Sequence, residues 1–331
     1  MNIYEQQSKN KKLTWIMLFV FIIFFIAIGA GFDYFYLGYT KTKYVNDTIT
    51  TQKEFVPFAT ISSLIISIIL IITSFSNGIK MIVSATGARP ANFEDLKEKQ
   101  FVNVVEEMSI AAGIPKPACY IVPDNDLNAF ATGFSPDKSY VFITQGLLEQ
   151  LNREELQAVI AHEISHIRFY DIRLMTVTAI LMNAIAMISD MMARSLRRNS
   201  YSSSSSSRNR NSGGGILFLI WIILVILAPI ISRMLAMAIS RQREYLADAG
   251  AAELTRNPKA LISALEKIRK SVQPTKNIKE SVAHMCITDP RGSLIEEKSG
   301  FIADLFATHP PMEKRILALK VMAYEQSKAK A

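Results

Sequence analysis

Long runs of apolar residues without any charge constrain this chain more than any other feature. The clearest run extends from about Phe58 to Ile79. As a helix rising 1.5 Å per residue, such a run is long enough to cross the ~30 Å hydrocarbon core of a bilayer. A second run, from Leu13 to about Gly31, directly follows Lys9, Lys11 and Lys12. We therefore expect a membrane protein, with a lipid bilayer as one of its partners.

The run from Leu13 to about Gly31, which comes first in the chain, has two interpretations, a cleaved signal peptide or a retained span. It is longer than the apolar part of a signal peptide, and no convincing small-residue cleavage site follows it. Aromatic residues do follow it, as is typical of a membrane–water interface: Phe32, Tyr34, Phe35, Tyr36 and Tyr39. A retained span is the better interpretation.

Two further apolar runs lie later in the chain, at 174–188 and 216–232. The first of these is short, contains Asn183 and is followed by Asp190, so its crossing is less secure than the others. The chain between them is a low-complexity loop rich in serine and glycine, which has no apolar groups to form a core. In total we expect two to four transmembrane helices.

The distribution of basic residues predicts the orientation. The amino-terminal lysines hold that end in the cytoplasm, and two crossings return the chain there at Lys80, so residues 80–173 are expected in the cytoplasm. Five arginines of the serine-rich loop disagree if both later runs span: Arg194, Arg197, Arg198, Arg208 and Arg210. Either the earlier segments dominate, or the two later runs form a hairpin that does not cross fully. Both alternatives return the chain to the cytoplasm.

The net charge of +8 and the pI of about 9.3 do not indicate a nucleic-acid-binding protein. The cations lie mainly at the edges of apolar runs and on helix faces among acids, which is typical of a membrane protein rather than of a groove that follows phosphates. Cys119 and Cys286 are the only cysteines. Without a CxxC pair they predict neither a disulfide framework nor a cysteine zinc site.

The remaining sequence predicts a mainly helical α+β fold with a small sheet. An amphipathic helix at 92–112 is stopped by Gly113 and Pro115. Short strands are expected at 118–122, 128–132 and 140–144. Later helices are expected to begin at Asn257-Pro258 and after Pro310-Pro311.

The best-specified helix, 152–169, carries a metal-binding pattern. Asn152 can cap this helix, with Glu155 completing a capping box. His162 and His166 are four residues apart and therefore project from one face, where both rings can reach a single ion. Glu163 lies beside the first histidine, placed to act on a metal-bound water. Because the neighbouring residues are apolar, an unpaired histidine pair buried here would be costly, which favours metal binding.

A catalytic zinc site needs a third protein ligand, since the fourth position is kept for water. The candidates are His284, His309 and acids on a later helix. Glu244 is our choice among them, because Glu244 and Asp248 share one helix face, one turn apart. Glu244 can bind zinc while Asp248 accepts a hydrogen bond from a ligand histidine and fixes its tautomer. A solvated charged helix is the alternative, and from the local pattern alone it is the more common one.

Three motifs together resemble the HtpX-type membrane zinc metalloproteases, relatives of the CAAX prenyl proteases. They are HEISH at 162–166, REYLAD at 243–248 and THPP at 308–311. The order of the apolar runs around them is also similar, over nearly the whole chain. The resemblance implies a zincin-like protease domain with one Zn²⁺ per chain, the ligands His162, His166 and Glu244, and Glu163 as the catalytic base. The long serine-rich insertion departs from the family pattern.

The same resemblance gives two further segments a role. His309 would lie near the site and donate a hydrogen bond to the oxyanion. Residues 128–133, NAFATG, resemble the edge strand of the family, so Asn128, Ala129, Phe130 and Ala131 are expected to pair with an extended peptide substrate. Without the resemblance, an incidental histidine and an ordinary strand would explain both segments.

The sequence thus predicts four segments. They are a membrane hairpin (1–84), the first part of the protease domain (85–173), an apolar hairpin with the serine-rich loop (174–240) and the second part of the protease domain (241–331). The expected function is cleavage of misfolded or membrane proteins at the cytoplasmic face of a bacterial inner membrane. A non-catalytic zinc scaffold or regulator is one alternative, although it would have no use for Glu163. A transporter is another, but the first two runs offer no ionisable groups for a pathway.

Overall fold

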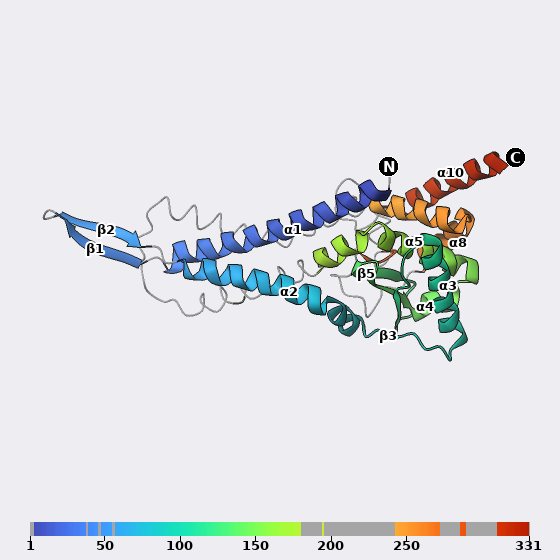
Figure 1. Cartoon of the computed structure of the whole chain (residues 1–331), viewed down its shortest axis with the longest axis horizontal. Coiled ribbons are helices and arrows are strands. Elements are labelled where there is room, and N and C mark those ends of the chain that lie inside the picture. Colours follow the sequence, from blue (N-terminus) through green and yellow to red (C-terminus); the bar gives the residue numbers. More distant parts are fainter. Residues whose placement is uncertain are drawn as a thin grey trace. The chain divides into compact units, whose positions relative to one another are not determined.

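The computed structural model describes residues 3–37, 39–45, 48–54, 57–179, 194, 242–271, 285–288 and 310–330. The described residues divide into two compact units. The first contains residues 3–14, 77–179, 242–271, 285–288 and 310–330, and the second contains the described residues between 15 and 76 together with 194; Figure 1 shows their helices and strands. Residues 3–14 therefore group with the segments that carry the histidine motif, and not with the apolar run that follows them.

The second unit consists of two long helices and a hairpin. In chain order its elements are α1 (Ile3–Phe32), the π-helical turn η1 (Asp33–Leu37), β1 (Tyr39–Val45), β2 (Thr48–Glu54) and α2 (Phe58–Thr86). The first turns of α1 and the last turns of α2 belong to the first unit. β1 and β2 are antiparallel, with Val45 opposite Thr48. The Asp33 carboxylate accepts 2.8 Å hydrogen bonds from the backbone N–H groups of Ala59 and Thr60 at the start of α2. This fixes the chain's return after the hairpin.

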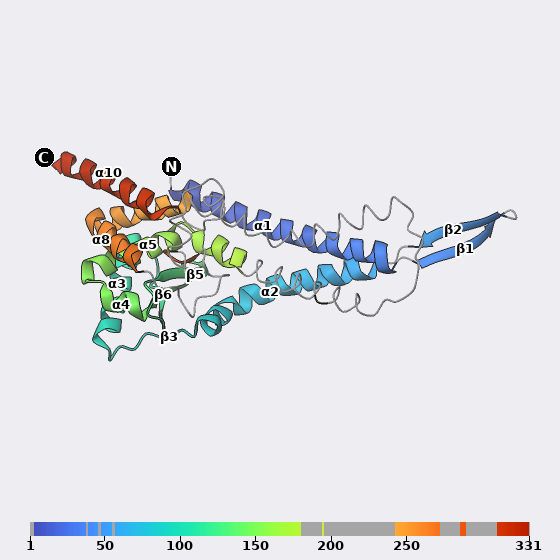
Figure 2. The ribbon, with the colours of Figure 1, turned by 180° about the vertical axis from the view of Figure 1, so that it is seen from behind.

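α1 and α2 have the properties expected of membrane spans. The helix from Tyr4 to Phe35 is long and apolar enough to cross a bilayer, and α2 passes the same test if Phe58–Thr73 and Phe75–Thr86 are taken together. They lie side by side in both ribbon views (Figures 1 and 2). At Gly29 a Cβ would lie 2.3 Å from the Ser63 Oγ of α2, so only glycine permits this close approach.

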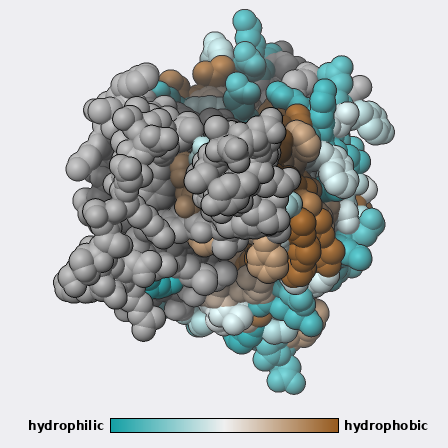
Figure 3. All heavy atoms as spheres, turned by 90° about the vertical axis from the view of Figure 1, so that its left-hand side faces the viewer, coloured by the Kyte–Doolittle hydropathy of each residue, from teal (hydrophilic) through white to brown (hydrophobic). Residues whose placement is uncertain are grey.

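Many large apolar side chains of these two helices are exposed, among them Phe19, Ile23, Ile61, Ile65, Ile69 and Ile72. The space-filling view also shows apolar surface open to the outside (Figure 3). Such surface is unfavourable in water and is typical of contact with lipid. The predicted third run, apart from residues 174–179, and the fourth run lie outside the described residues.

The first unit contains a four-stranded mixed sheet of order β3-β4-β6-β5. Its strands are β3 (Arg89–Pro90), β4 (Ala118–Val122), β5 (Ala129–Ser135) and β6 (Lys138–Thr144). β4 and β6 are parallel, while β5 runs antiparallel to β6 and forms an edge of the sheet. The pairing shifts between Gly133 and Ser135, where Gly133 has a φ of 142° that suits only glycine.

Helices surround this sheet, and the buried apolar side chains form one large cluster and one smaller one. The helices are α3 (Leu96–Ala112), α4 (Gln145–Gln150), α5 (Arg153–Arg168), unlabelled helical segments at 171–179 and 242–255, α8 (Pro258–Lys270) and α10 (Met312–Lys330). α5 is central, since it contacts α3, α8 and β5. Twelve of its sixteen residues are buried, from Glu155 through Ile167. A helix surrounded in this way can hold polar side chains away from water.

The predicted elements are largely confirmed, as is the mainly helical α+β fold. α3 ends at Ala112, with Gly113 in the left-handed conformation, but it begins at Leu96 rather than 92 because Asp95 caps it. The strand predicted at 118–122 has those bounds, and the other two extend further, to 129–135 and 138–144. The hairpin of β1 and β2 was not predicted.

Candidate metal centre

α5 begins with a complete capping box, which sets the position of the histidines along it. The Asn152 side chain accepts a 2.9 Å hydrogen bond from the Glu155 N–H, and the Glu155 carboxylate accepts one of 2.9 Å from the Asn152 N–H. Glu155 also accepts from Ser263 and Lys267 of α8. The start of α5 is thereby fixed both locally and by a neighbouring helix.

Two turns further along, His162 and His166 project from one face of α5, as predicted. Both are buried, and their Nε2 atoms are 3.2 Å apart with the rings perpendicular. Glu244, from the helical segment 242–255, places Oε2 3.6 Å from the His162 Nε2 and Oε1 3.6 Å from the His166 Nε2. These three side chains form the one group able to hold a metal ion among the described residues.

The spacing of these three side chains fits a metal ion. An ion with tetrahedral geometry and bonds of ~2.0–2.2 Å sets its ligand atoms about 3.4 Å apart, close to the separation of the two Nε2 atoms and to the distance from each of them to its nearer Glu244 oxygen. Two imidazoles and one carboxylate, with a fourth position left over, are the ligand set of catalytic zinc sites. Three buried polar side chains that converge in this way would be costly without a cation between them.

Each histidine turns its other nitrogen toward a carboxylate. The His162 Nδ1 lies 3.0 Å from the Asp248 Oδ1, and the His166 Nδ1 lies 3.1 Å from the Asp171 Oδ2. Both carboxylates are buried. A carboxylate at Nδ1 holds the proton there and leaves Nε2 free to bind a metal, so it fixes both the tautomer and the ring orientation. The predicted position of Asp248 agrees with this role, whereas Asp171 was not predicted.

Arg315 of α10 is a further member of the site that was not predicted. It is fully buried and holds Asp248 through two hydrogen bonds, Nε to Oδ2 at 2.9 Å and Nη2 to Oδ1 at 2.7 Å. Its Nη1 lies 3.2 Å from the Glu244 Oε2 and donates to the Ile287 carbonyl at 2.8 Å. The one available signal is its place on the helix that follows Pro310-Pro311.

The charges around His162 act in opposite directions on its pKa. Burial lowers that pKa, but hydrogen bonding to Asp248 and Glu244 outweighs burial and raises it to about 9. On Asp248 burial acts the other way and raises the pKa. The charge of Arg315 and the hydrogen bonds from His162 and Arg315 outweigh burial and bring the pKa of Asp248 below its usual value. Asp248 is therefore held as an anion, as a partner of a metal-bound imidazole should be.

Glu163 lies beside the cluster and does not belong to it. It is 1% exposed, and burial raises its pKa, which Glu244 raises further while His162, His166 and the Ala131 backbone N–H lower it. Its Oε2 has no hydrogen-bond partner within the described ranges. A buried carboxylate oxygen without a partner, next to three side chains that could hold a metal ion, is suited to take a proton from water.

The predicted substrate strand lies directly against this site, but its outer edge is covered where an exposed edge was expected. The Ile287 N–H donates to the Ala129 carbonyl at 2.9 Å, and Cys286 forms an antiparallel bridge with Phe130. Asn128 donates to the Thr288 carbonyl at 3.2 Å. β5 therefore already bonds to residues 285–288 of its own chain, through an isolated bridge and backbone and side-chain hydrogen bonds.

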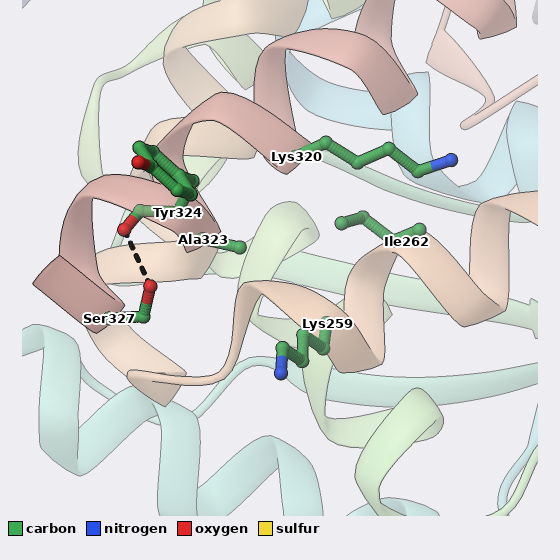
Figure 4. A pocket seen from close by; sticks show the side chains of 6 residues that line it. All are labelled: Lys259, Ile262, Lys320, Ala323, Tyr324 and Ser327. Atoms are coloured by element: carbon green, nitrogen blue, oxygen red, sulfur yellow. Dashed lines mark hydrogen bonds between the residues drawn. The ribbon is translucent and has the colours of Figure 1, made fainter.

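Two predicted or considered histidines, His284 and His309, lie outside the described residues. A surface groove of about 430 Å³ between α8 and α10 shares no residue with the cluster (Figure 4). It is lined by Lys259, Ile262, Lys320, Ala323, Tyr324 and Ser327. The Ser327 hydroxyl donates to the Tyr324 carbonyl, and Lys320 pairs with Glu266 at 3.5 Å. Nothing in this groove resembles a catalytic group.

Comparison with known proteins agrees with the arrangement. Residues 95–323 match the sequence profile of peptidase family M48. Proteins named "Protease HtpX homolog" are similar over nearly their whole length. The one from Dictyoglomus thermophilum is 39% identical over 320 residues, covering 96% of this chain and 94% of its own length. That from Streptococcus pyogenes serotype M28 is 41% identical over 325 residues, covering 97% and 100%.

Among solved structures, that of Ste24p from S. mikatae is similar, with a TM-score of 0.46 and 19% sequence identity. The similarity covers 77% of this chain and 57% of that one, so the chain spans little more than half the length of Ste24p.

Proposed function

Because this chain belongs to peptidase family M48 and is a membrane metalloprotease, we propose that it is a zinc-dependent endopeptidase with His162, His166 and Glu244 as ligands. The observation that carries the proposal is the convergence of these three side chains at separations suited to a tetrahedral ion, with the Glu163 carboxylate beside them. The two imidazoles favour zinc over magnesium and calcium, since these two ions prefer oxygen ligands.

When bound, the zinc ion supplies Lewis acidity, which makes a water molecule more acidic and polarises the scissile carbonyl. Glu163 accepts a proton from the attacking water at its unpartnered Oε2 as the new C–O bond forms. It then returns that proton to the amine nitrogen as the C–N bond breaks. Asp248 and Asp171 keep the imidazoles oriented throughout. His309 is the proposed donor to the oxyanion.

For the substrate we propose an extended peptide that pairs with β5 along Asn128–Ala131. The support is the bonding of this edge to residues 285–288, since a strand edge that bonds to one backbone segment can bond to an extended peptide in its place. Such pairing uses backbone groups and is nearly independent of sequence, which suits unfolded or misfolded proteins. The test is a set of peptide substrates that each carry one N-methylated backbone amide. KM should rise for those methylated at an amide that bonds to β5, and an equal KM for all positions would contradict the pairing.

We propose further that the protease unit faces the cytoplasm of a bacterial cell and that the chain crosses its membrane more than once. The Gln7 side chain donates to the Arg168 carbonyl of α5 at 2.7 Å, so the start of α1 and the metal centre belong on the same side of the membrane. The lysines that precede the apolar run favour the cytoplasmic side. Proteolytic quality control of membrane proteins would fit this position.

The direct test compares wild-type protein with Glu163→Gln, both purified in detergent. We expect about one zinc per chain in each, because Glu163 is not a ligand, and a loss of cleavage of an unfolded protein by roughly 10²–10⁴-fold in the variant. Wild-type cleavage by zinc-loaded Glu163→Gln would remove Glu163 as the base. Wild-type protein that cleaves without bound zinc would overturn the assignment of the metal.

A further inference from the structure

The start of α1 covers the turn that ends the metal-binding helix. Helix ends leave backbone carbonyls without partners, and here α1 supplies the donors. Gln7 donates to the Arg168 carbonyl at 2.7 Å, and Asn10 donates to the Phe169 carbonyl at 2.9 Å. The Lys11 ammonium lies 4.1 Å from the centroid of the Tyr170 ring. These contacts join residues about 160 positions apart in the sequence.

The turn needs this support because its backbone is strained. Tyr170 has a φ of 61°, in the left-handed region that a residue with a bulky side chain seldom adopts. The strained conformation reverses the chain immediately after α5 and brings Asp171 back against His166, five residues earlier. The position of the Asp171 carboxylate thus depends on how firmly the turn is held.

Asn10 holds that carboxylate directly. Its Nδ2 donates to the Asp171 Oδ1 at 2.5 Å as well as to the Phe169 carbonyl. Both partners can only accept, so the amide nitrogen, and not the amide oxygen, must face them. Asn10 is 1% exposed, and Asp171 is fully buried. Among the described residues the Arg243 guanidinium also approaches this oxygen, but its Nε lies 3.7 Å away, beyond hydrogen-bonding distance.

We propose that Asn10 is a positioning residue of the metal centre, which acts through Asp171 on the ring orientation of His166. The inference rests on the proposed function in taking His166 as a metal ligand. Its physical basis is a chain of two contacts. The Asn10 amide donates a hydrogen bond to the Asp171 carboxylate, and the other oxygen of that carboxylate lies 3.1 Å from the His166 Nδ1. Since Asn10 precedes the apolar run by three residues, the helix that enters the membrane also helps to build the metal site.

The test uses Asn10→Ala and Asn10→Asp in full-length protein that carries Glu163→Gln, which prevents self-cleavage. Alanine removes the donor, while aspartate keeps the size of the side chain and puts a carboxylate oxygen against Asp171. Zinc affinity is measured by competition with a chelator, and the visible absorption spectrum of bound Co²⁺ reports the geometry around the metal. Gln7→Ala is the matched control, because it removes a hydrogen bond from the same end of α1 without touching Asp171.

We expect zinc affinity to fall about tenfold in Asn10→Ala, the lower end of the range for residues that support metal ligands, and further in Asn10→Asp. Both variants should change the Co²⁺ spectrum, whereas Gln7→Ala should keep the wild-type spectrum and affinity. A role in folding alone would lower the melting temperature in all three variants and leave the spectrum of the bound metal unchanged. Wild-type zinc affinity and an unchanged spectrum in Asn10→Asp would overturn the proposal.

His166→Ala, measured in the same way, separates this inference from the proposed function. If His166→Ala binds zinc like the wild type, the ligand assignment itself fails. If it loses zinc while both Asn10 variants retain wild-type affinity and spectrum, the ligand assignment holds and only the role of Asn10 fails.

Discussion

The two histidines of the metal centre have the same kind of direct partner but differ in the group that supports that partner. On each side an imidazole Nδ1 lies about 3 Å from a buried carboxylate, Asp248 for His162 and Asp171 for His166. On the first side the carboxylate is held by the charged Arg315 of α10 through two hydrogen bonds. On the second it is held by the neutral amide of Asn10 in α1, with Arg243 at a longer distance.

In this site an imidazole and a buried carboxylate recur on both sides, while the group that holds the carboxylate is a cation on one side and an amide on the other. The two holders, Asn10 and Arg315, lie far apart in the sequence, so the support of the site depends on long-range contacts. Loss of a charge inside the fold should cost more than loss of an amide, since a buried carboxylate would lose its counter-ion.

The largest effects are expected where the two sides are alike. His162→Ala and His166→Ala should each lower zinc affinity by more than ~100-fold, because changes at supporting residues alone cost 10–100-fold. Metal content after dialysis and chelator competition measure this. If one variant kept nearly the wild-type zinc affinity, the two histidines would not be equivalent ligands.

A smaller but still large effect is expected at Arg315. Arg315→Gln leaves Asp248 and Glu244 buried without their cation, so the free energy of unfolding should fall by ~3–5 kcal/mol. Thermal unfolding of the metal-free protein measures it. The matched control is Arg269→Gln, since the Arg269–Glu313 pair also ties α10 to another helix, here α8, but at the surface. The control should change stability by less than ~1 kcal/mol, and equal losses would show that Arg315 acts as an ordinary tether.

The smallest effect is expected at the opposite end of α5 from Asn10. Asn152→Ala removes the side chain that caps the helix and should cost ~1 kcal/mol of stability, while Asn152→Ser, which keeps a capping oxygen, should cost less. Neither should change zinc affinity or the Co²⁺ spectrum. A changed spectrum in Asn152→Ala would mean that any loosening of α5 disturbs the metal, and that the end held by α1 is not special.

Local patterns predicted the inner part of this site. The capping box at Asn152 and the four-residue spacing of the histidines are short-range features, and the structure has both. Glu244 required more, since a charged helix was the alternative from the local pattern. Its choice depended on the resemblance to a family, and the structure brings its carboxylate to the two histidines.

The outer part could not be predicted because its contacts are long-range. Arg315 binds a carboxylate 67 positions away, and in the sequence it looks like any other cation of an amphipathic helix. Asn10 precedes an apolar run among lysines, where a solvated end is expected. Asp171 lies only five residues after His166, but the turn between them depends on a left-handed tyrosine, a conformation that the residue type does not favour.

The hairpin of β1 and β2 is a different case, because its signal was present. Threonine-rich segments flank Asn46-Asp47, a composition typical of two strands joined by a tight turn. The aromatic residues that precede these segments indicate an interfacial belt, and this stronger pattern obscures the strand signal beside it. The hairpin can therefore be predicted from local composition, whereas the long-range contacts cannot.

If two imidazoles and one carboxylate hold the metal, X-ray absorption at the zinc edge, on the zinc-loaded protein in detergent, will detect them. We expect two imidazole nitrogens and further oxygen ligands at ~2.0–2.2 Å and no sulfur, with the loss of one imidazole in whatever metal His166→Ala retains. A sulfur shell at ~2.3 Å, or a wild-type spectrum with fewer than two imidazoles, would refute this ligand set.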